Sequence, residues 1–134
     1  MTEPSLRYPL GDHERDRVVT STGRPLNEIT LDAVRAGAVT PEDLAIHADT
    51  LRAQAAIAEE GGYPQLAANL RRAAELVVVP QAMVLTVYEA LRPYRVTHER
   101  LRALADELER DYGARENARL LREAAEVYRE RHLL

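Results

Sequence analysis

The sequence predicts an all-α protein: a compact bundle of about six or seven helices, four of them long, that follows an extended N-terminal arm. Apolar residues recur at three- and four-residue spacing through most of the chain, which is the period of a helix with one buried face. The core must consist of Leu, Ala, Val and Ile, because the 134 residues include no Trp and no Phe. Pro and Gly stand between the periodic segments, where they begin or end helices. No segment has the pattern of a strand.

The chain divides by composition into two parts. Residues 1–25 are polar, charged and broken by prolines and a glycine. We expect them to form an extended arm, which is either a frayed terminus or a segment that lies across a neighbouring protein. Residues 26–134 are expected to form a single helical domain, since their length suits one hydrophobic core.

Short helices come first in the helical domain. The pattern predicts one helix over residues 30–36, which Gly37 can end in a left-handed conformation. Thr40 is a good N-cap and Pro41 fits the first helical position, so a further turn of helix is expected there.

Two long helices with a very short connection follow. Asp49 or Thr50 is expected to cap the first, which runs to about Glu60, and Pro64 opens the second. A connection this short makes the two helices antiparallel neighbours. The residues expected on their apolar stripes are Leu51, Ala55, Ala58, Leu66, Ala67, Leu70, Ala73, Ala74 and Val77.

The next helix lies between two prolines. Pro80 is expected at its first position, where the missing N–H leaves no bond unmade. Pro93 biases Arg92 away from helical geometry and closes the helix. Its apolar stripe comprises Val84, Leu85, Val87, Tyr88 and Leu91.

Two further helices complete the chain. Thr97 is expected to cap the first and Gly113 to end it, and the last helix runs over residues 114–132. The last helix should also carry two ion pairs at four-residue spacing, Arg119–Glu123 and Arg122–Glu126. The stripe residues of the pair are Leu101, Leu104, Ala105, Leu108, Tyr112, Ala118, Leu121, Ala125 and Tyr128.

The residues argue against chemistry in this chain. There is no Cys, and all eighteen basic residues are Arg. A thiolate, a Schiff-base lysine and a phosphate-loop lysine are therefore excluded. The four histidines do not share helical ligand spacing, and His98 is expected to be a solvated first-turn residue. The carboxylates fall on polar faces, so we predict no catalytic, cofactor-binding or metal-binding residue.

The charge and hydropathy exclude two partner classes. The formal net charge is −4, whereas phosphate contacts by basic residues dominate nucleic-acid affinity. A helix-turn-helix over residues 84–108 is disfavoured further by the acidic residues 106, 107 and 109. No apolar run is long enough to span a membrane, and no secretory signal is recognisable. We expect a cytoplasmic protein.

One corner of the sequence has an open interpretation. Arg92 and Arg95 flank Pro93 and Tyr94. The arginines either complement the negative end of a helix or belong to a rigid, aromatic contact with another subunit.

Six blocks in order resemble the small subunit of adenosylcobalamin-dependent diol and glycerol dehydratases. The resemblance covers nearly the whole chain, although no single block is a catalytic signature. The blocks are Tyr8-Pro9-Leu10, GRPLNEITLDAVRAGAVTPEDL (23–44), DTLRAQAAIAEEGG (49–62), LAANLRRAAELVVVPQAMVLTVYEALRPYRVT (66–97), LRALADELERDYGA (101–114) and LLREAAEVYRERHLL (120–134).

The resemblance implies a non-catalytic small subunit that packs on the large catalytic subunit and contributes assembly and stability. It also implies a medium subunit, a reaction that converts a 1,2-diol or glycerol to an aldehyde plus water, and adenosylcobalamin bound by the complex rather than by this chain. A bacterial microcompartment is one location to consider within the cytoplasm. The predicted subunit-interface residues are Tyr8, Pro9, Leu10, Arg92, Pro93, Tyr94 and Arg95. The alternative is a stand-alone helical adaptor or homo-oligomeric interaction protein that has lost its dehydratase partners.

Overall fold

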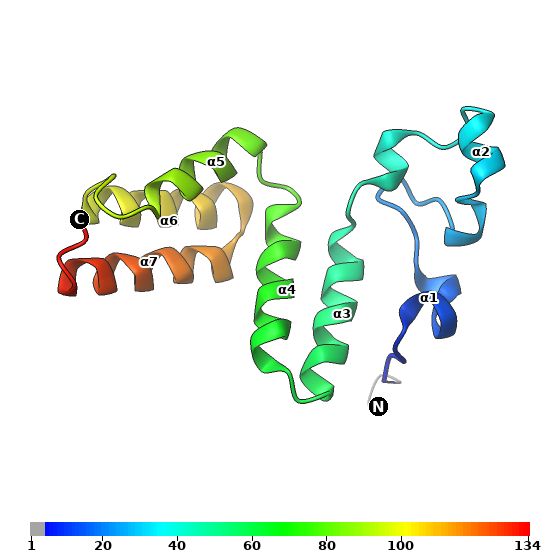
Figure 1. The fold of residues 1–134 in the computed structure, drawn as a ribbon, viewed down its shortest axis with the longest axis horizontal. Coiled ribbons are helices and arrows are strands. Elements are labelled where there is room, and N and C mark those ends of the chain that lie inside the picture. The colour runs from blue at the N-terminus through cyan, green and yellow to red at the C-terminus, as the bar shows by residue number, and fades with distance from the viewer. Residues whose placement is uncertain (1–4) are drawn as a thin grey trace. The chain divides into compact units, whose positions relative to one another are not determined.

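A computed structural model describes residues 5–134 of the chain (Figure 1). These residues form seven α-helices and three short 3₁₀ helices, and they contain no β-strand beyond one isolated bridge between Val19 and Pro25. The all-α prediction is confirmed, and the four longest helices are the four expected ones. The chain divides into two compact units, one that ends at Ala74 and one that begins at Glu75. The boundary near residue 25 between an arm and a single helical domain stays a prediction.

The first unit begins with short elements. Two of them lie in the segment that we expected to be extended, because Leu10 turns inward and is only 9% exposed. The elements of this unit are α1 (Leu10–His13), η1 (Arg15–Arg17), η2 (Leu26–Glu28), α2 (Leu31–Arg35), η3 (Pro41–Leu44), α3 (Ala48–Glu60) and most of α4 (Pro64–Leu76).

The caps of the short helices follow the sequence. The Thr30 hydroxyl accepts a hydrogen bond from the Ala33 N–H and so begins α2. Gly37 then adopts a φ of +72°, which a residue without Cβ tolerates. Thr40 precedes Pro41 at the start of η3.

Helices α3 and α4 form an antiparallel hairpin (Figure 1). Ala55, Ala58 and Ala67 are buried between them, and Leu70 packs against this cluster. The predicted N-cap of α3 was wrong: the helix begins at Ala48, and His47 takes the cap position without a side-chain bond. Leu66 remains half exposed, because only one narrow stripe of α4 faces the small side chains of α3.

The second unit contains α5 (Gln81–Ala90), α6 (His98–Tyr112) and α7 (Arg115–Glu130). Thr97 caps α6 by accepting a hydrogen bond from the Arg100 N–H, and Gly113 ends it with a φ of +66°, as predicted. The buried core residues of this unit are Val79, Ala90, Leu101, Leu104, Ala105, Leu108, Ala114, Ala118, Leu121 and Ala125.

Helix α5 differs from the prediction at its start and along its stripe. Pro80 is the N-cap rather than the first helical residue. Its ψ of 141° is extended, so the helix begins one residue later. Val84 and Val87 pack against the core of the unit, but Leu85 is 58% exposed and Tyr88 is 68% exposed.

Candidate subunit interface

The corner over residues 92–95 joins α5 to α6 and is held by the C-terminal end of α7. The Tyr94 N–H donates a hydrogen bond of 2.7 Å to the Leu133 carbonyl. The Tyr128 hydroxyl donates one of 2.6 Å to the Leu91 carbonyl. These two bonds join segments about forty residues apart in the chain and fix the conformation of the corner.

Tyr94 is the strained residue of this corner. Its φ is +62°, in the left-handed region that residues with a Cβ seldom adopt. Its side chain nevertheless points outward and leaves the residue 70% exposed. The fold therefore holds an aromatic ring in solvent at a conformational cost.

The two arginines of the corner share one carboxylate. Arg92 Nη1 lies 3.2 Å from Glu89 Oε2, and Arg95 Nε lies 3.5 Å from Glu89 Oε1. Pro93 is exposed between them. This arrangement places the arginines at the C-terminal end of α5 and is compatible with both interpretations of the corner.

The other predicted interface residues lie in the first unit. Tyr8 is 76% exposed and Pro9 is exposed, whereas Leu10 is buried within its own unit. Leu10 can support the segment but offers little area to a partner. The seven predicted residues therefore form one group in each unit, and their role as an interface stays a prediction.

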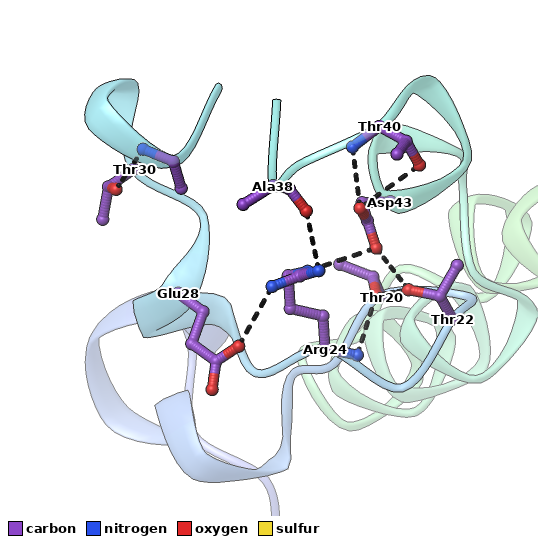
Figure 2. A network of polar contacts seen from close by, with 9 residues as sticks. Thr20, Thr22, Arg24, Glu28, Thr30, Ala38, Thr40 and Asp43 are labelled. Carbon is purple, nitrogen blue, oxygen red and sulfur yellow. Dashed lines mark hydrogen bonds and ion pairs between the residues drawn. The ribbon is translucent and has the colours of Figure 1, made fainter. Parts of the chain in front are cut away.

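A polar network that the sequence did not indicate ties the loops of the first unit together (Figure 2). The Arg24 guanidinium donates a hydrogen bond of 2.8 Å to the Ala38 carbonyl and one of 3.2 Å to Glu28. Arg24 Nε also lies 3.4 Å from Asp43 Oδ1. One arginine thus connects three loop segments, around residues 28, 38 and 43.

Asp43 is the buried centre of this network. Its carboxylate accepts hydrogen bonds from the Thr22 hydroxyl and from the Thr40 N–H, the latter at 2.8 Å. These two bonds, and then the nearby Arg24 guanidinium, lower the pKa of Asp43 from 3.8 to about 2. Both carboxylate oxygens of Asp43 accept hydrogen bonds from the chain itself, which is the pattern of a structural residue.

Helix α7 receives its N-cap from a distant residue. Its N-cap position is Ala114, which has no side-chain acceptor. The Glu75 carboxylate accepts hydrogen bonds from the backbone N–H groups of Glu116 and Asn117, at 2.9 and 3.0 Å, and from the Asn117 side-chain amide at 2.7 Å. Sequence reasoning missed this contact because no local signal marks a cap supplied 41 residues away.

The prediction for His98 was wrong. Its Nε2 lies 2.8 Å from Glu126 Oε1, and its side chain is only 18% exposed. This hydrogen bond is the main reason that the pKa of Glu126 is lowered, with Arg129 as the next favourable cause. The expected Arg122–Glu126 pair is replaced, since Arg122 instead lies 2.7 Å from both Asp106 and Glu109 on α6. The Arg119–Glu123 pair is present at 3.9 Å.

Residues 5–134 contain neither a metal-binding cluster nor a membrane-spanning helix. No group of three or more His, Cys, Asp or Glu side chains in that range is placed to hold a metal ion. None of the helices described there is long and apolar enough to cross a bilayer. The described residues do show a set of exposed aromatic and aliphatic side chains on small helical units.

Comparison with known proteins gives the family. The family model described as dehydratase small subunit matches residues 4–134. The chain is 46% identical, over 127 residues, to the propanediol dehydratase small subunit of Salmonella typhimurium strain LT2. The aligned region covers 95% of this chain and 73% of that protein. It is likewise 46% identical to the propanediol dehydratase small subunit of Citrobacter freundii, over 95% of this chain and 74% of that protein. The chain belongs to the dehydratase small-subunit family, and is thus a subunit of a lyase complex rather than a complete enzyme.

Proposed function

We propose that this chain is the small subunit of an adenosylcobalamin-dependent dehydratase that converts 1,2-propanediol, or a closely related diol or glycerol, to an aldehyde and water. Its role is to pack on the large catalytic subunit, beside a medium subunit, and to stabilise the assembled enzyme. The observation that carries the proposal is the identity of 46% to two propanediol dehydratase small subunits across 95% of the chain. We further propose that the complex works in the cytoplasm, with a microcompartment as a candidate location.

The surface of the chain supports an assembly role. Large apolar residues are exposed on both units. In the first unit they include Leu31, Leu44, Ile46 and Tyr63, which are 63–67% exposed. In the second they include Val78, Tyr88 and Tyr94, which are 66–70% exposed. A partner that covers such residues would remove their unfavourable contact with water.

No residue of this chain is assigned to the cofactor or the substrate. When bound to the complex, adenosylcobalamin supplies the radical that starts a 1,2-rearrangement. The two histidines that are not fully exposed face carboxylates instead: His98 lies 2.8 Å from Glu126, and His47 lies 4.0 Å from Asp49. The contribution of this chain is accordingly to the geometry and lifetime of the assembly.

Co-expression with the large and medium subunits of the same organism tests the proposal. We expect a three-component complex that co-purifies and forms aldehyde from 1,2-propanediol with added adenosylcobalamin. Omission of this chain should reduce the activity and the thermal stability of the remaining pair. The matched control is co-expression of an unrelated all-α protein of similar size in its place.

Two results would contradict the proposal. Purification of this chain alone, with unchanged dehydratase activity in its absence, would favour the stand-alone adaptor. A complex that forms but has no activity on diols or glycerol would keep the subunit role and remove the proposed substrates.

A further inference from the structure

Helix α5 is apolar around most of its circumference. Between Gln81 and Ala90 its only charged residue is Glu89. Its neighbours α6 and α7 have ordinary charged faces. A helix that is apolar all round is normally covered on more than one side, yet in this unit α5 buries only Ala90 completely and leaves Leu85 and Tyr88 in solvent.

A groove runs beside α5 on the side that faces α7. We call it the α5–α7 groove; it is lined by Leu76, Val84, Tyr88 and Leu91 on one side and by Asn117 and Leu120 on the other. Tyr88 and Leu120 form its open edge, at 68% and 38% exposure. The side-chain amide of Asn117 already donates to Glu75. The lining contains no charged side chain.

Charged residues near the groove already have partners within the chain: the Glu75 carboxylate accepts a hydrogen bond from Asn117, and Arg119 is ion-paired on α7. Arg119 lies 2.6 Å from Glu116 and 3.9 Å from Glu123 on α7. A partner therefore meets a lining without charged side chains, and apolar burial rather than charge steering must hold it.

We propose that the α5–α7 groove binds an apolar, uncharged segment of the large dehydratase subunit. The inference rests on the proposed function and adds to it the surface and the chemistry of the contact. Membership of a small-subunit family gives the chain a permanent partner, and permanent interfaces are the more hydrophobic class. Tyr88 is the expected anchor, since Tyr is one of the residue types that most often carry the binding free energy of an interface.

The test measures the affinity of the complete chain for the large–medium subunit pair. Tyr88→Glu and Leu120→Glu place a carboxylate in the groove, and each should weaken binding by at least about 30-fold. Ala82→Glu puts the same charge on an exposed position of α5 outside the groove, and its affinity should stay within about threefold of the wild type. Tyr88→Phe should bind as the wild type does. Circular dichroism and thermal unfolding check that each variant is folded, which we expect because both groove positions are solvent-accessible in the isolated chain.

Salt dependence gives an independent readout. Raising the salt concentration from about 0.05 M to about 0.5 M should change the affinity by less than about threefold, because screening acts on charges and none faces the groove. A steep loss with salt would overturn the apolar character of the contact.

The outcomes separate this inference from the proposed function. Wild-type affinity in the folded Tyr88→Glu and Leu120→Glu variants overturns the groove and leaves the subunit role intact. Failure of the wild-type chain to bind the pair at all removes both. If sedimentation shows the isolated chain to be a dimer that Tyr88→Glu makes monomeric, while subunit binding is unchanged, the groove belongs to a second copy and the inference fails.

Discussion

Asp43 shows how a single residue can connect several loops. Its buried carboxylate accepts hydrogen bonds from the Thr22 hydroxyl and the Thr40 N–H, and it forms an ion pair with the Arg24 guanidinium. A buried carboxylate is tolerated only when it is paired and hydrogen-bonded. The first unit therefore depends on the ionised form of this one side chain.

The pKa of Asp43 gives a prediction for acid stability. The pKa is about 2 in the folded chain against an ordinary 3.8, so the unfolded chain takes up this proton at the higher pH. The stabilisation is fully present above the unfolded pKa and is lost as the pH falls through about 4 towards about 2. Asp43→Asn should lower the stability of the first unit at neutral pH and flatten its pH dependence in this window. Thermal unfolding and hydrogen exchange between these pH values measure both.

A matched control is Asp32→Asn, because the Asp32 side chain is 96% exposed. It should leave the acid profile of the first unit unchanged. An acid profile in Asp43→Asn as steep as that of the wild type would contradict the assignment of the transition to Asp43.

Tyr94 gives a prediction that separates folding from binding. In Tyr94→Gly the left-handed φ no longer costs roughly 1 kcal/mol, but the unfolded chain gains about 0.4–1 kcal/mol of conformational freedom. The free energy of unfolding of the isolated chain should therefore change by less than about 1 kcal/mol. Binding to the large–medium pair should weaken, because the exposed ring is lost.

Tyr94→Ala serves as the comparison. It keeps the strain and removes the same ring, so it should match Tyr94→Gly in binding and be no more stable. If both variants bind with wild-type affinity, Tyr94 is not part of the interface, and the interpretation of Arg92 and Arg95 as helix-end charges gains support.

At the scale of elements, α7 depends on a cap that lies outside it. Glu75→Ala leaves the N–H groups of Glu116 and Asn117 without their acceptor in a partly buried place. We expect a loss of about 1–3 kcal/mol in the free energy of unfolding of the second unit. Glu75→Gln keeps an acceptor oxygen and should lose less. Chemical denaturation followed by circular dichroism measures the difference.

Glu123→Ala is the control for this prediction. The Glu123 side chain is on the same helix and 66% exposed, so its removal should change the stability by less than about 0.5 kcal/mol. Equal losses in Glu75→Ala and Glu123→Ala would show that general surface charge, rather than the cap, supports α7.

The elements differ in how far the sequence predicted them. Helix α6 was predicted in full, because Thr97, Gly113 and the stripe from Leu101 to Leu108 are local signals. The caps of α3 and α5 were misplaced by one to three residues, since His47 and Pro80 take the cap position without a side-chain bond. Helix boundaries of that kind depend on backbone angles more than on residue type.

The candidate site was less predictable than the helices. The exposed corner at residues 92–95 was found from its composition. The Arg24–Asp43 contact, the Glu75 cap and the His98–Glu126 pair were not found, because each joins residues 19 to 42 positions apart. The α5–α7 groove was also not predicted: Val84, Tyr88 and Leu91 were expected on a core stripe, but Tyr88 remains exposed, and Leu120 at the other edge of the groove was on no predicted stripe.

At the scale of the whole molecule, the two units differ in the size of their buried apolar side chains. The second unit holds the four largest fully buried side chains, Leu101, Leu104, Leu108 and Leu121. The buried cluster of the α3–α4 hairpin consists of three alanines with Leu70 beside them. Burial of alanine removes little apolar area from water, and the stabilisation follows the buried area.

The difference in core predicts which part of the chain needs its partner most. In the isolated chain, backbone amides of α3 and α4 should exchange with deuterium faster than those of α6 and α7, because regions with few buried apolar contacts open at lower free energy. In the complex with the large and medium subunits, the α3–α4 hairpin should gain the larger protection. Hydrogen–deuterium exchange with mass spectrometry on the free chain and on the complex measures both states. Uniform protection in the free chain would contradict the prediction and would mean that the short loops and the Arg24–Asp43 network stabilise the first unit as well as a leucine core stabilises the second.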